Sequence, residues 1–327
     1  GFSNPAELSL TTKMANSPED VVVFLKELAA RAKPFAQKEL DEITSYSTQI
    51  ESNRKVEPWD IPFISEKLKK SRFAIDNEEL RSYFPLGKVL FGLFETVKDL
   101  FGCEIHREQD HSSEILWEDS VQIFRVVTEG QTTGYFFFDL FSREEKRGGA
   151  WMDECRSRIK HDSGVQTPIA LMNCNFSQPI AHEDVYLTHD EVVTLFHEFG
   201  HGLHHLLTEM DYLEISGISG VEWDAVELPS QFLENFAWEY ETLQRISEHR
   251  DTGLPINKEM FERIYAAKNF NSGLQMIRQI EFALFDILIH KDLTNCALLD
   301  DEQVYRQVLE TLEIVRREIS VIKQPSF

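Results

Sequence analysis

The segment LTHDEVVTLFHEFGHGLHHLL, residues 187–207, decides the fold class and contains the principal candidate site. Thr188 and Glu191 have the spacing of a capping box, and Leu187 can pack on Val192, so a helix is expected to begin here. Apolar residues surround its histidines on nearly all sides, which predicts that the helix is buried. Burying two histidines and a glutamate is costly unless a charge or a metal organises them.

The same helix contains the pattern HExxH, here HEFGH. His197 and His201 are four residues apart, so both imidazoles project from one face and can hold a single zinc ion. Glu198 lies beside them, where it can contact a metal-bound water. The sequence therefore predicts a zinc site. The alternative is a buried helix whose histidines pair with backbone or carboxylate groups.

Catalytic zinc sites generally use three protein ligands and leave one position for water. The metzincin spacing would require glycine and histidine at the positions of His204 and Leu207, so that class is excluded. In the gluzincin solution a following helix supplies a glutamate, whereas a thiolate ligand from Cys155 or Cys174 would be the deformylase-type alternative, which no accompanying motif supports. Glu227 is the strongest candidate because Pro229 suits the first turn of a new helix. Other carboxylates stay open as ligands or as partners of the ligands, namely Glu222, Asp224 and Glu234.

Three further side chains are candidates for supporting the ligands. Glu234 is two helical turns after Glu227, so Glu234 or Gln231 is placed to accept a hydrogen bond from the ring N–H of a ligating histidine. His204 lies about 20° from His197 on the helical wheel. We expect His204 to support the site or to pack in the core.

The rest of the chain predicts an α+β fold that is mainly α-helical. The residues SPED at 17–20 predict a helix start, and apolar residues spaced by three and four predict another helix over about 88–102. Aromatic and β-branched runs at 121–127 and 133–140, joined by a glycine-containing turn, predict a hairpin, and residues 168–176 predict a third strand.

The length favours two lobes, on the prior of about 150 residues each. We expect a helical lobe over residues 1–110 and a catalytic zinc-binding region over residues 111–327. The catalytic region is expected to contain a small sheet at residues 120–180 and the HExxH helix at residues 188–208. The third-ligand helix is expected at residues 227–249, and C-terminal helices at residues 257–322.

Composition argues against two kinds of partner. Lys plus Arg number 33 against 56 Asp plus Glu, and the resulting net charge of −23 would repel nucleic acid. No stretch approaches the ~20 apolar residues of a membrane helix. Four widely spaced cysteines without a CxxC pattern fit reduced thiols and a cytoplasmic location, or an organelle interior if a transit peptide has been removed.

The stretch FHEFGHGLHHLLTEMDYLEISGISGVEWDAVELPSQFLENFAWE resembles the thimet oligopeptidase family of zinc metallopeptidases, and within it the oligopeptidase A branch. Residues 1–15, 138–155 and 173–179 resemble family segments in the same order, so the likeness covers essentially the whole chain. It implies a gluzincin-like catalytic domain with a small β-sheet beside the HExxH helix. It also implies one Zn²⁺ ion bound by His197, His201 and Glu227.

The resemblance further implies a metalloendopeptidase that hydrolyses internal bonds of short peptides. Glu198 would be the general base and a zinc-bound water the nucleophile. In this family an edge strand and a glycine-rich turn pair with the substrate backbone, which the likeness places at Gly148, Gly149 and Ala150. A plain glycine-containing loop is the alternative interpretation of these three residues.

Family members are longer at both ends, and a tyrosine-rich loop follows the segment that matches EISVIKQPSF, where this chain ends at Phe327. We therefore expect the central portion of an oligopeptidase, truncated at both ends and weakly active or inactive. Two alternatives stay open: a non-catalytic zinc- and peptide-binding fragment or regulatory protein, and a metal-free helical interaction protein. Cobalt or manganese can also occupy such ligands.

Overall fold

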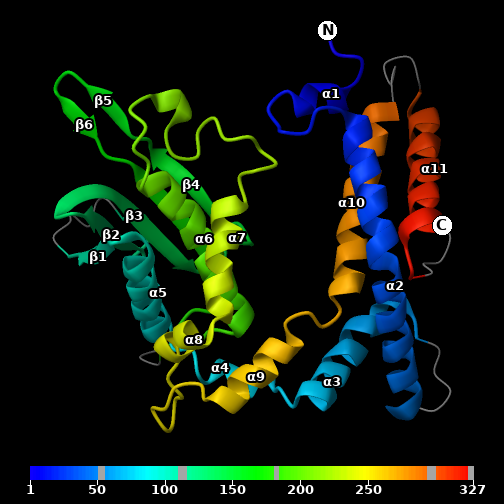
Figure 1. Ribbon diagram of the computed structural model, residues 1–327, viewed down its shortest axis with the longest axis horizontal. Helices are drawn as coiled ribbons and strands as arrows, with labels where there is room; N and C mark the ends of the chain where they lie inside the picture. Colours follow the sequence, from blue (N-terminus) through cyan, green and yellow to red (C-terminus); the bar gives the residue numbers. More distant parts are fainter. Residues whose placement is uncertain (51–55, 110–115, 180–183, 293–299, 323–327) are drawn as a thin grey trace. The chain divides into compact units, whose positions relative to one another are not determined.

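A computed structural model describes residues 1–50, 56–109, 116–179, 184–292 and 300–322, which form two compact units (Figure 1). Unit 1 combines Gly1–Ile75, Glu222–Asp224 and Ala266–Phe327, and unit 2 combines Asp76–Val221 and Ala225–Tyr265. These units interleave along the chain, whereas the expected domains 1–110 and 111–327 are consecutive, and that division stays a prediction. Residues 111 and 327, which bound the expected catalytic region, lie outside the described ranges.

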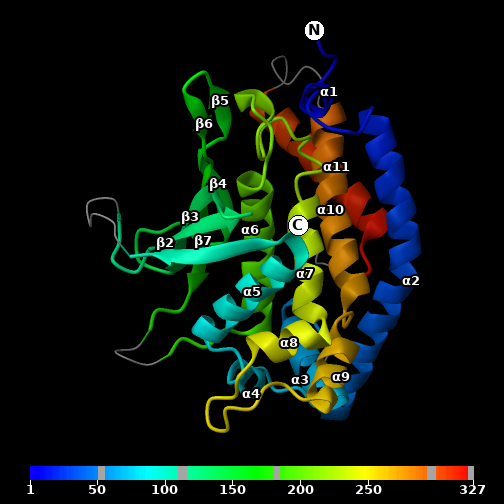
Figure 2. The same ribbon diagram turned by 60° about the vertical axis from the view of Figure 1, so that its left-hand side comes forward.

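Unit 1 is built from helices. The long helices α2 (Pro18–Ile50) and α10 (Ser272–Asp292) lie side by side (Figures 1 and 2). The Ser17 hydroxyl accepts a hydrogen bond from the Asp20 amide at 3.1 Å, so the predicted helix start is confirmed. The remaining helical elements are α1 (Pro5–Leu10), η1 (Pro58–Asp60), α3 (Ile61–Phe73) and α11 (Asp301–Ile319).

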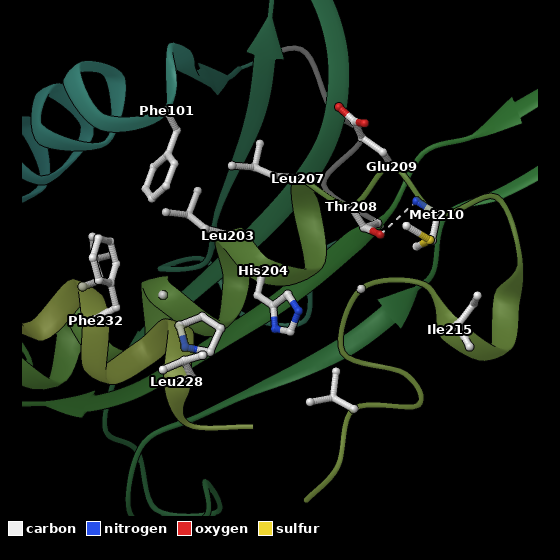
Figure 3. Close-up of a pocket in the computed structure, with 15 residues that line it drawn as sticks. Phe101, Leu203, His204, Leu207, Thr208, Glu209, Met210, Ile215, Leu228 and Phe232 are labelled. Carbon is white, nitrogen blue, oxygen red and sulfur yellow. Dashed lines mark hydrogen bonds between the residues drawn. The ribbon is translucent and has the colours of Figure 1, made fainter. Parts of the chain in front are cut away.

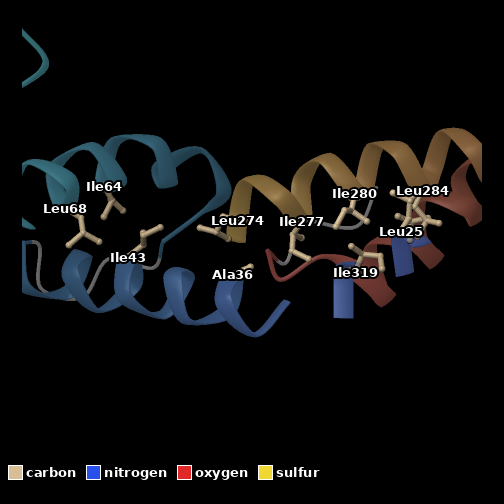
Figure 4. Packing of buried hydrophobic residues seen from close by; sticks show 12 residues of the cluster. Leu25, Ala36, Ile43, Ile64, Leu68, Leu274, Ile277, Ile280, Leu284 and Ile319 are labelled. Atoms are coloured by element: carbon tan, nitrogen blue, oxygen red, sulfur yellow. The ribbon is translucent and has the colours of Figure 1, made fainter. Parts of the chain in front are cut away.

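The core of unit 1 lies where α2 meets α3, α10 and α11, and its side chains interdigitate along the length of α2 (Figure 4). Gly273 allows α10 to start against α2, because a Cβ at this position would lie 2.7 Å from the Ala36 amide nitrogen. The Glu39 carboxylate accepts hydrogen bonds from the Gly273 and Leu274 amides at 3.1 and 2.8 Å. Apolar packing and a capped helix start therefore fix the same contact.

Unit 2 contains a five-stranded sheet in the order β1-β2-β3-β7-β4. Strands β2 and β3 form the predicted hairpin, whose turn residues Glu129 and Gly130 both have positive φ. The predicted third strand is β7, which pairs parallel to β3. The strands are β1 (Cys103–Glu108), β2 (Gln122–Thr128), β3 (Gln131–Phe141), β7 (Ile169–Phe176) and β4 (Trp151–Arg156), and β5 (Ile159–His161) pairs with β6 (Gly164–Gln166).

Helix α6 (His189–Leu206) packs against this sheet (Figure 2). Phe199 of α6 contacts Phe136 and Phe138 of β3 at ring-centroid distances of 5.4 and 5.9 Å. Phe94 joins this cluster from α5 (Leu86–Phe101), the second predicted helix, which ends at Gly102 in a left-handed conformation. The expected mainly helical α+β fold, with a small sheet beside the HExxH helix, is confirmed.

The segment expected as one helix over 227–249 is divided into α7 (Leu228–Glu234), η4 (Asn235–Trp238) and α8 (Tyr240–Ile246). The Asn235 side chain donates to the carbonyls of Gln231 and Phe232, which competes with continued helical bonding. The other helical elements are α4 (Asn77–Arg81), η3 (Leu213–Ile215) and α9 (Lys258–Ala267). None of the helices in the described ranges combines the length and the apolar composition that a membrane-spanning helix needs.

Candidate metal centre

The start of α6 is fixed by the capping box that the sequence predicts. The Thr188 hydroxyl accepts a hydrogen bond from the Glu191 amide at 3.2 Å, and the Glu191 carboxylate accepts one from the Thr188 amide at 2.7 Å. Leu187 and Val192 are fully buried on either side of this cap. The cap therefore sets where the helix starts, and with it the face on which its histidines project.

The side chains of His197, His201 and Glu227 converge in unit 2. Glu227 Oε2 lies 3.1 Å from the Nε2 atoms of both His197 and His201, and one ligand atom from each residue lies within 4.8 Å of the other two. Tetrahedral zinc with bonds of about 2.0–2.2 Å separates its ligand atoms by about 3.3–3.6 Å. Two imidazole nitrogens and one carboxylate oxygen at this spacing fit a zinc ion.

Close contact between α6 and α7 brings Glu227 to the histidines. A Cβ at Gly200 would lie 2.6 Å from Ser230 Cα and 2.7 Å from the Pro229 carbonyl oxygen, so only glycine permits this approach. The Ser230 hydroxyl lies 2.9 Å from both the main-chain carbonyl oxygen and Oε2 of Glu227, so its one proton is shared between these acceptors and helps to orient the carboxylate. Sequence reasoning missed Ser230, although a serine three residues after a candidate ligand at a helix start is a detectable signal.

Glu234 lies against the first histidine, at 2.5 Å between its Oε1 and His197 Nδ1. A neutral His197 that donates its Nδ1–H to Glu234 presents a lone pair at Nε2, which faces the acceptor oxygen of Glu227. Two acceptors at 3.1 Å repel each other unless a proton or a metal ion lies between them, and a metal ion at this place would be bound by both atoms. Gln231, the other candidate for this hydrogen bond, has an exposed side chain.

Burial perturbs the neighbouring titratable groups. Burial raises the pKa of Glu198 to about 7, with the charge of His197 opposing and that of Glu227 adding to this shift, and Glu198 is only 5% exposed. Burial also lowers the pKa of His201, an effect that outweighs the nearby carboxylate of Glu227. A neutral imidazole is the form that binds a metal.

His204 does not join the metal-binding group. It lies on the wall of an apolar cavity of about 770 Å³, which is also lined by Leu203 of α6, by Leu207 directly after α6, and by Leu228 and Phe232 of α7 (Figure 3). Its Nδ1 is buried and has no hydrogen-bond partner among the described residues. Burial and the neighbouring His205 lower the pKa of His204.

Two of the alternative carboxylates have other surroundings. The Asp224 carboxylate, in unit 1, accepts hydrogen bonds from the Met14 and Ala15 amides at 2.8 and 3.1 Å. Glu222 is exposed. In the part of the chain that the structure describes, the group able to hold a metal therefore consists of His197, His201 and Glu227.

Gly148, Gly149 and Ala150 form the connection that leads into β4, at one edge of the sheet. Gly149 has a φ of +93°, a conformation that side chains rarely adopt. The Asn175 side-chain amide, from β7, donates to the carbonyls of Arg147 and Gly149 at 2.8 and 2.6 Å. The Asn175 side chain therefore fixes this loop to the sheet. Among the described residues, no strand pairs with the outer side of β4, which follows the loop.

Comparison with known proteins places the chain in a family. Residues 1–323 match peptidase family M3. Oligopeptidase A of Haemophilus influenzae is 46% identical over 99% of this chain and 46% of that protein. Oligopeptidase A of Escherichia coli is 44% identical over 100% of this chain and 47% of that protein. The organellar oligopeptidase A of Arabidopsis thaliana is 40% identical over 89% of this chain and 37% of that protein. The chain thus spans about half the length, or less, of these relatives.

Proposed function

The chain belongs to peptidase family M3, and we propose that it binds one zinc ion through His197, His201 and Glu227 and hydrolyses internal bonds of short peptides. The observation that carries this proposal is the convergence of three ligand atoms from two touching helices. The names of its relatives, which include oligopeptidase A, support peptides as the substrate class.

A zinc ion in this site would polarise the scissile carbonyl and lower the pKa of a water molecule, which is the nucleophile. Glu198, next to His197 in the chain and 5% exposed, takes the proton of the attacking water and returns it to the leaving amine. Glu234 fixes the ring of His197, and Ser230 orients Glu227. These groups are held before substrate arrives, which reduces the reorganisation needed during the reaction.

The substrate main chain lies along Gly148, Gly149 and Ala150 in this proposal. An extended peptide adds to the open edge of the sheet through main-chain hydrogen bonds, a mode of binding that tolerates many sequences. The proposal includes a cytoplasmic location, and the names of two Arabidopsis relatives specify cytosolic or organellar proteins.

A cleavage assay tests the proposed chemistry. The zinc-loaded chain is mixed with an internally quenched octapeptide, and Glu198→Gln is compared with Glu191→Gln, which alters the helix cap instead. We expect the parent protein to cleave the peptide slowly and only with zinc. Glu198→Gln should abolish cleavage while one zinc per chain stays bound. Glu191→Gln should retain cleavage. Equal cleavage by the parent and Glu198→Gln proteins would contradict the assignment of the base.

A further inference from the structure

Lys146 is an almost fully buried lysine, with 3% of its side chain exposed, in the connection between β3 and β4. Its ammonium donates to the carbonyls of Asp139, Phe141 and Cys174 at 2.7, 3.0 and 2.6 Å, and to Asp139 Oδ1 at 2.9 Å. One side chain therefore joins the end of β3, the end of β7 and the connection that leads into β4.

The partner carboxylate is equally enclosed. Asp139 is 2% exposed and also accepts two hydrogen bonds from Arg143 and one from Trp117. Burial raises the pKa of Asp139, but the bonds from Arg143, Lys146 and Trp117 outweigh this and hold it at about 2. Asp139 is thus ionised at neutral pH, and both Lys146 and Arg143 pair with it.

The position of Lys146 follows from an irregularity in the sheet. Strands β3 and β7 pair regularly up to Asp139 and Asn173, and then shift register before Phe141 pairs with Phe176. The carbonyls that Lys146 binds belong to this irregular part. The ammonium therefore replaces the ladder hydrogen bonds that the register shift interrupts.

His205 holds the other end of β4. It is fully buried in α6, and its Nε2 lies 3.0 Å from the carbonyl oxygen of Arg156, the last residue of the strand. Its ring packs on Gly217, where a Cβ would lie 2.3 Å from Nδ1. The end of β4 is thereby fixed to the helix that contains the metal-binding histidines.

Between these two contacts, β4 packs against α6, the helix that contains the proposed base Glu198. Trp151, the first residue of β4, pairs with Asn173. The last four residues of β4 are exposed, and its outer side has no paired strand among the described residues.

We infer that Lys146 and His205 are positioning residues, which hold the two ends of β4 so that its outer edge can bind an extended peptide main chain beside Glu198. This inference rests on the proposed function and adds to it the groups that set the peptide-binding strand. Neither residue contacts the substrate. Both act by keeping the backbone of residues 147–156 in register with α6.

The test uses two readouts in the zinc-loaded protein. Amide hydrogen exchange over residues 147–156 reports the positioning directly and needs no ligand. Binding of a fluorescein-labelled, alanine-rich octapeptide reports whether the positioned strand binds a peptide. Every protein in this binding measurement also carries Glu198→Gln, so that the probe is not cleaved. Zinc content and thermal unfolding are recorded for each variant.

Lys146→Met is expected to accelerate exchange over residues 147–156 and to weaken probe binding about tenfold, the loss expected when one or two main-chain hydrogen bonds no longer form. Zinc content should stay at one per chain. Lys160→Met, at an exposed lysine in β5, is the matched control and should change neither readout more than twofold.

His205→Gln and His205→Leu separate positioning from packing. Glutamine retains a donor for the Arg156 carbonyl, so it should keep more probe affinity than leucine, whereas a purely packing role would favour leucine. Unchanged exchange and binding in Lys146→Met and His205→Leu would overturn the inference. A parent protein that binds zinc but no probe would instead contradict the proposed function.

Discussion

Gly200 offers the sharpest test of how the metal-binding side chains are brought together. In Gly200→Ala the new Cβ would lie 2.6 Å from Ser230 Cα and 2.7 Å from the Pro229 carbonyl oxygen. Non-bonded carbon atoms prefer about 3.5–4.0 Å, so α7 must retreat by about 1 Å. Glu227, at the start of α7, would move with it and away from two nitrogens that now lie 3.1 Å from its Oε2.

We predict that Gly200→Ala binds zinc about 10–100-fold more weakly, the range typical when groups that orient metal ligands are disturbed. Its stability should change less, because overpacking costs ~1–3 kcal/mol while replacing a mid-helix glycine by alanine returns ~1 kcal/mol. Competition with a chromophoric chelator measures the zinc affinity, and urea unfolding measures the stability.

Gly202→Ala in the same helix is the matched control. Its Cβ would meet Met172 Cε at 2.1 Å, but this atom is the end of a flexible side chain rather than backbone. Zinc affinity in Gly202→Ala should therefore stay within about threefold of the parent protein. Full zinc affinity in a folded Gly200→Ala protein, or equal losses in the two variants, would refute this reasoning.

Three further predictions concern the surroundings of the site. Ser230→Ala removes the hydrogen bond to Glu227 and should weaken zinc binding about tenfold in the chelator titration; unchanged affinity would show that Glu227 needs no such support. Thr188→Ala should lower the free energy of unfolding by ~1 kcal/mol in urea, and an unshifted midpoint would contradict the cap. Asp139 has a folded pKa of about 2 against an ordinary 3.8, so its ~2 kcal/mol contribution is fully present above pH 3.8 and is lost as the pH falls through 2. In urea unfolding between pH 4 and pH 2, the free energy of unfolding of Asp139→Asn should lose this dependence on pH, whereas that of the control Asp119→Asn, changed at an exposed position, should keep it. Equal curves of unfolding free energy against pH for the two variants would contradict this prediction.

Local signals were sufficient for the elements that have strong patterns. The capping box at Thr188 and the apolar residues around His197 predicted α6, and the aromatic runs around Gly130 predicted the hairpin. Local patterns missed the two edge strands, because β1 and β4 bury few side chains and so lack an alternating apolar pattern; only the family resemblance indicated an edge strand, next to Gly148. Their pairing depends on a neighbouring strand that the local sequence does not specify.

The candidate site was predictable only in part for a similar reason. The spacing of His197 and His201 follows from the geometry of one helix. Among four carboxylates in the following segment, the sequence favoured Glu227 through Pro229 but could not show the contact at Gly200 that brings the helices together. Lys146 likewise gave no signal, because its four acceptors lie on two strands, β3 and β7, that are distant from each other in the sequence.

The central claim is that His197, His201 and Glu227 together hold one zinc ion. The most direct measurement is the zinc content per chain, by atomic spectroscopy, after dialysis against micromolar zinc and then against metal-free buffer. We predict one zinc per chain in the parent protein and in Glu198→Gln, and a content near zero in Glu227→Ala. A parent protein without zinc, or a Glu227→Ala protein that keeps one zinc per chain, would contradict the assignment.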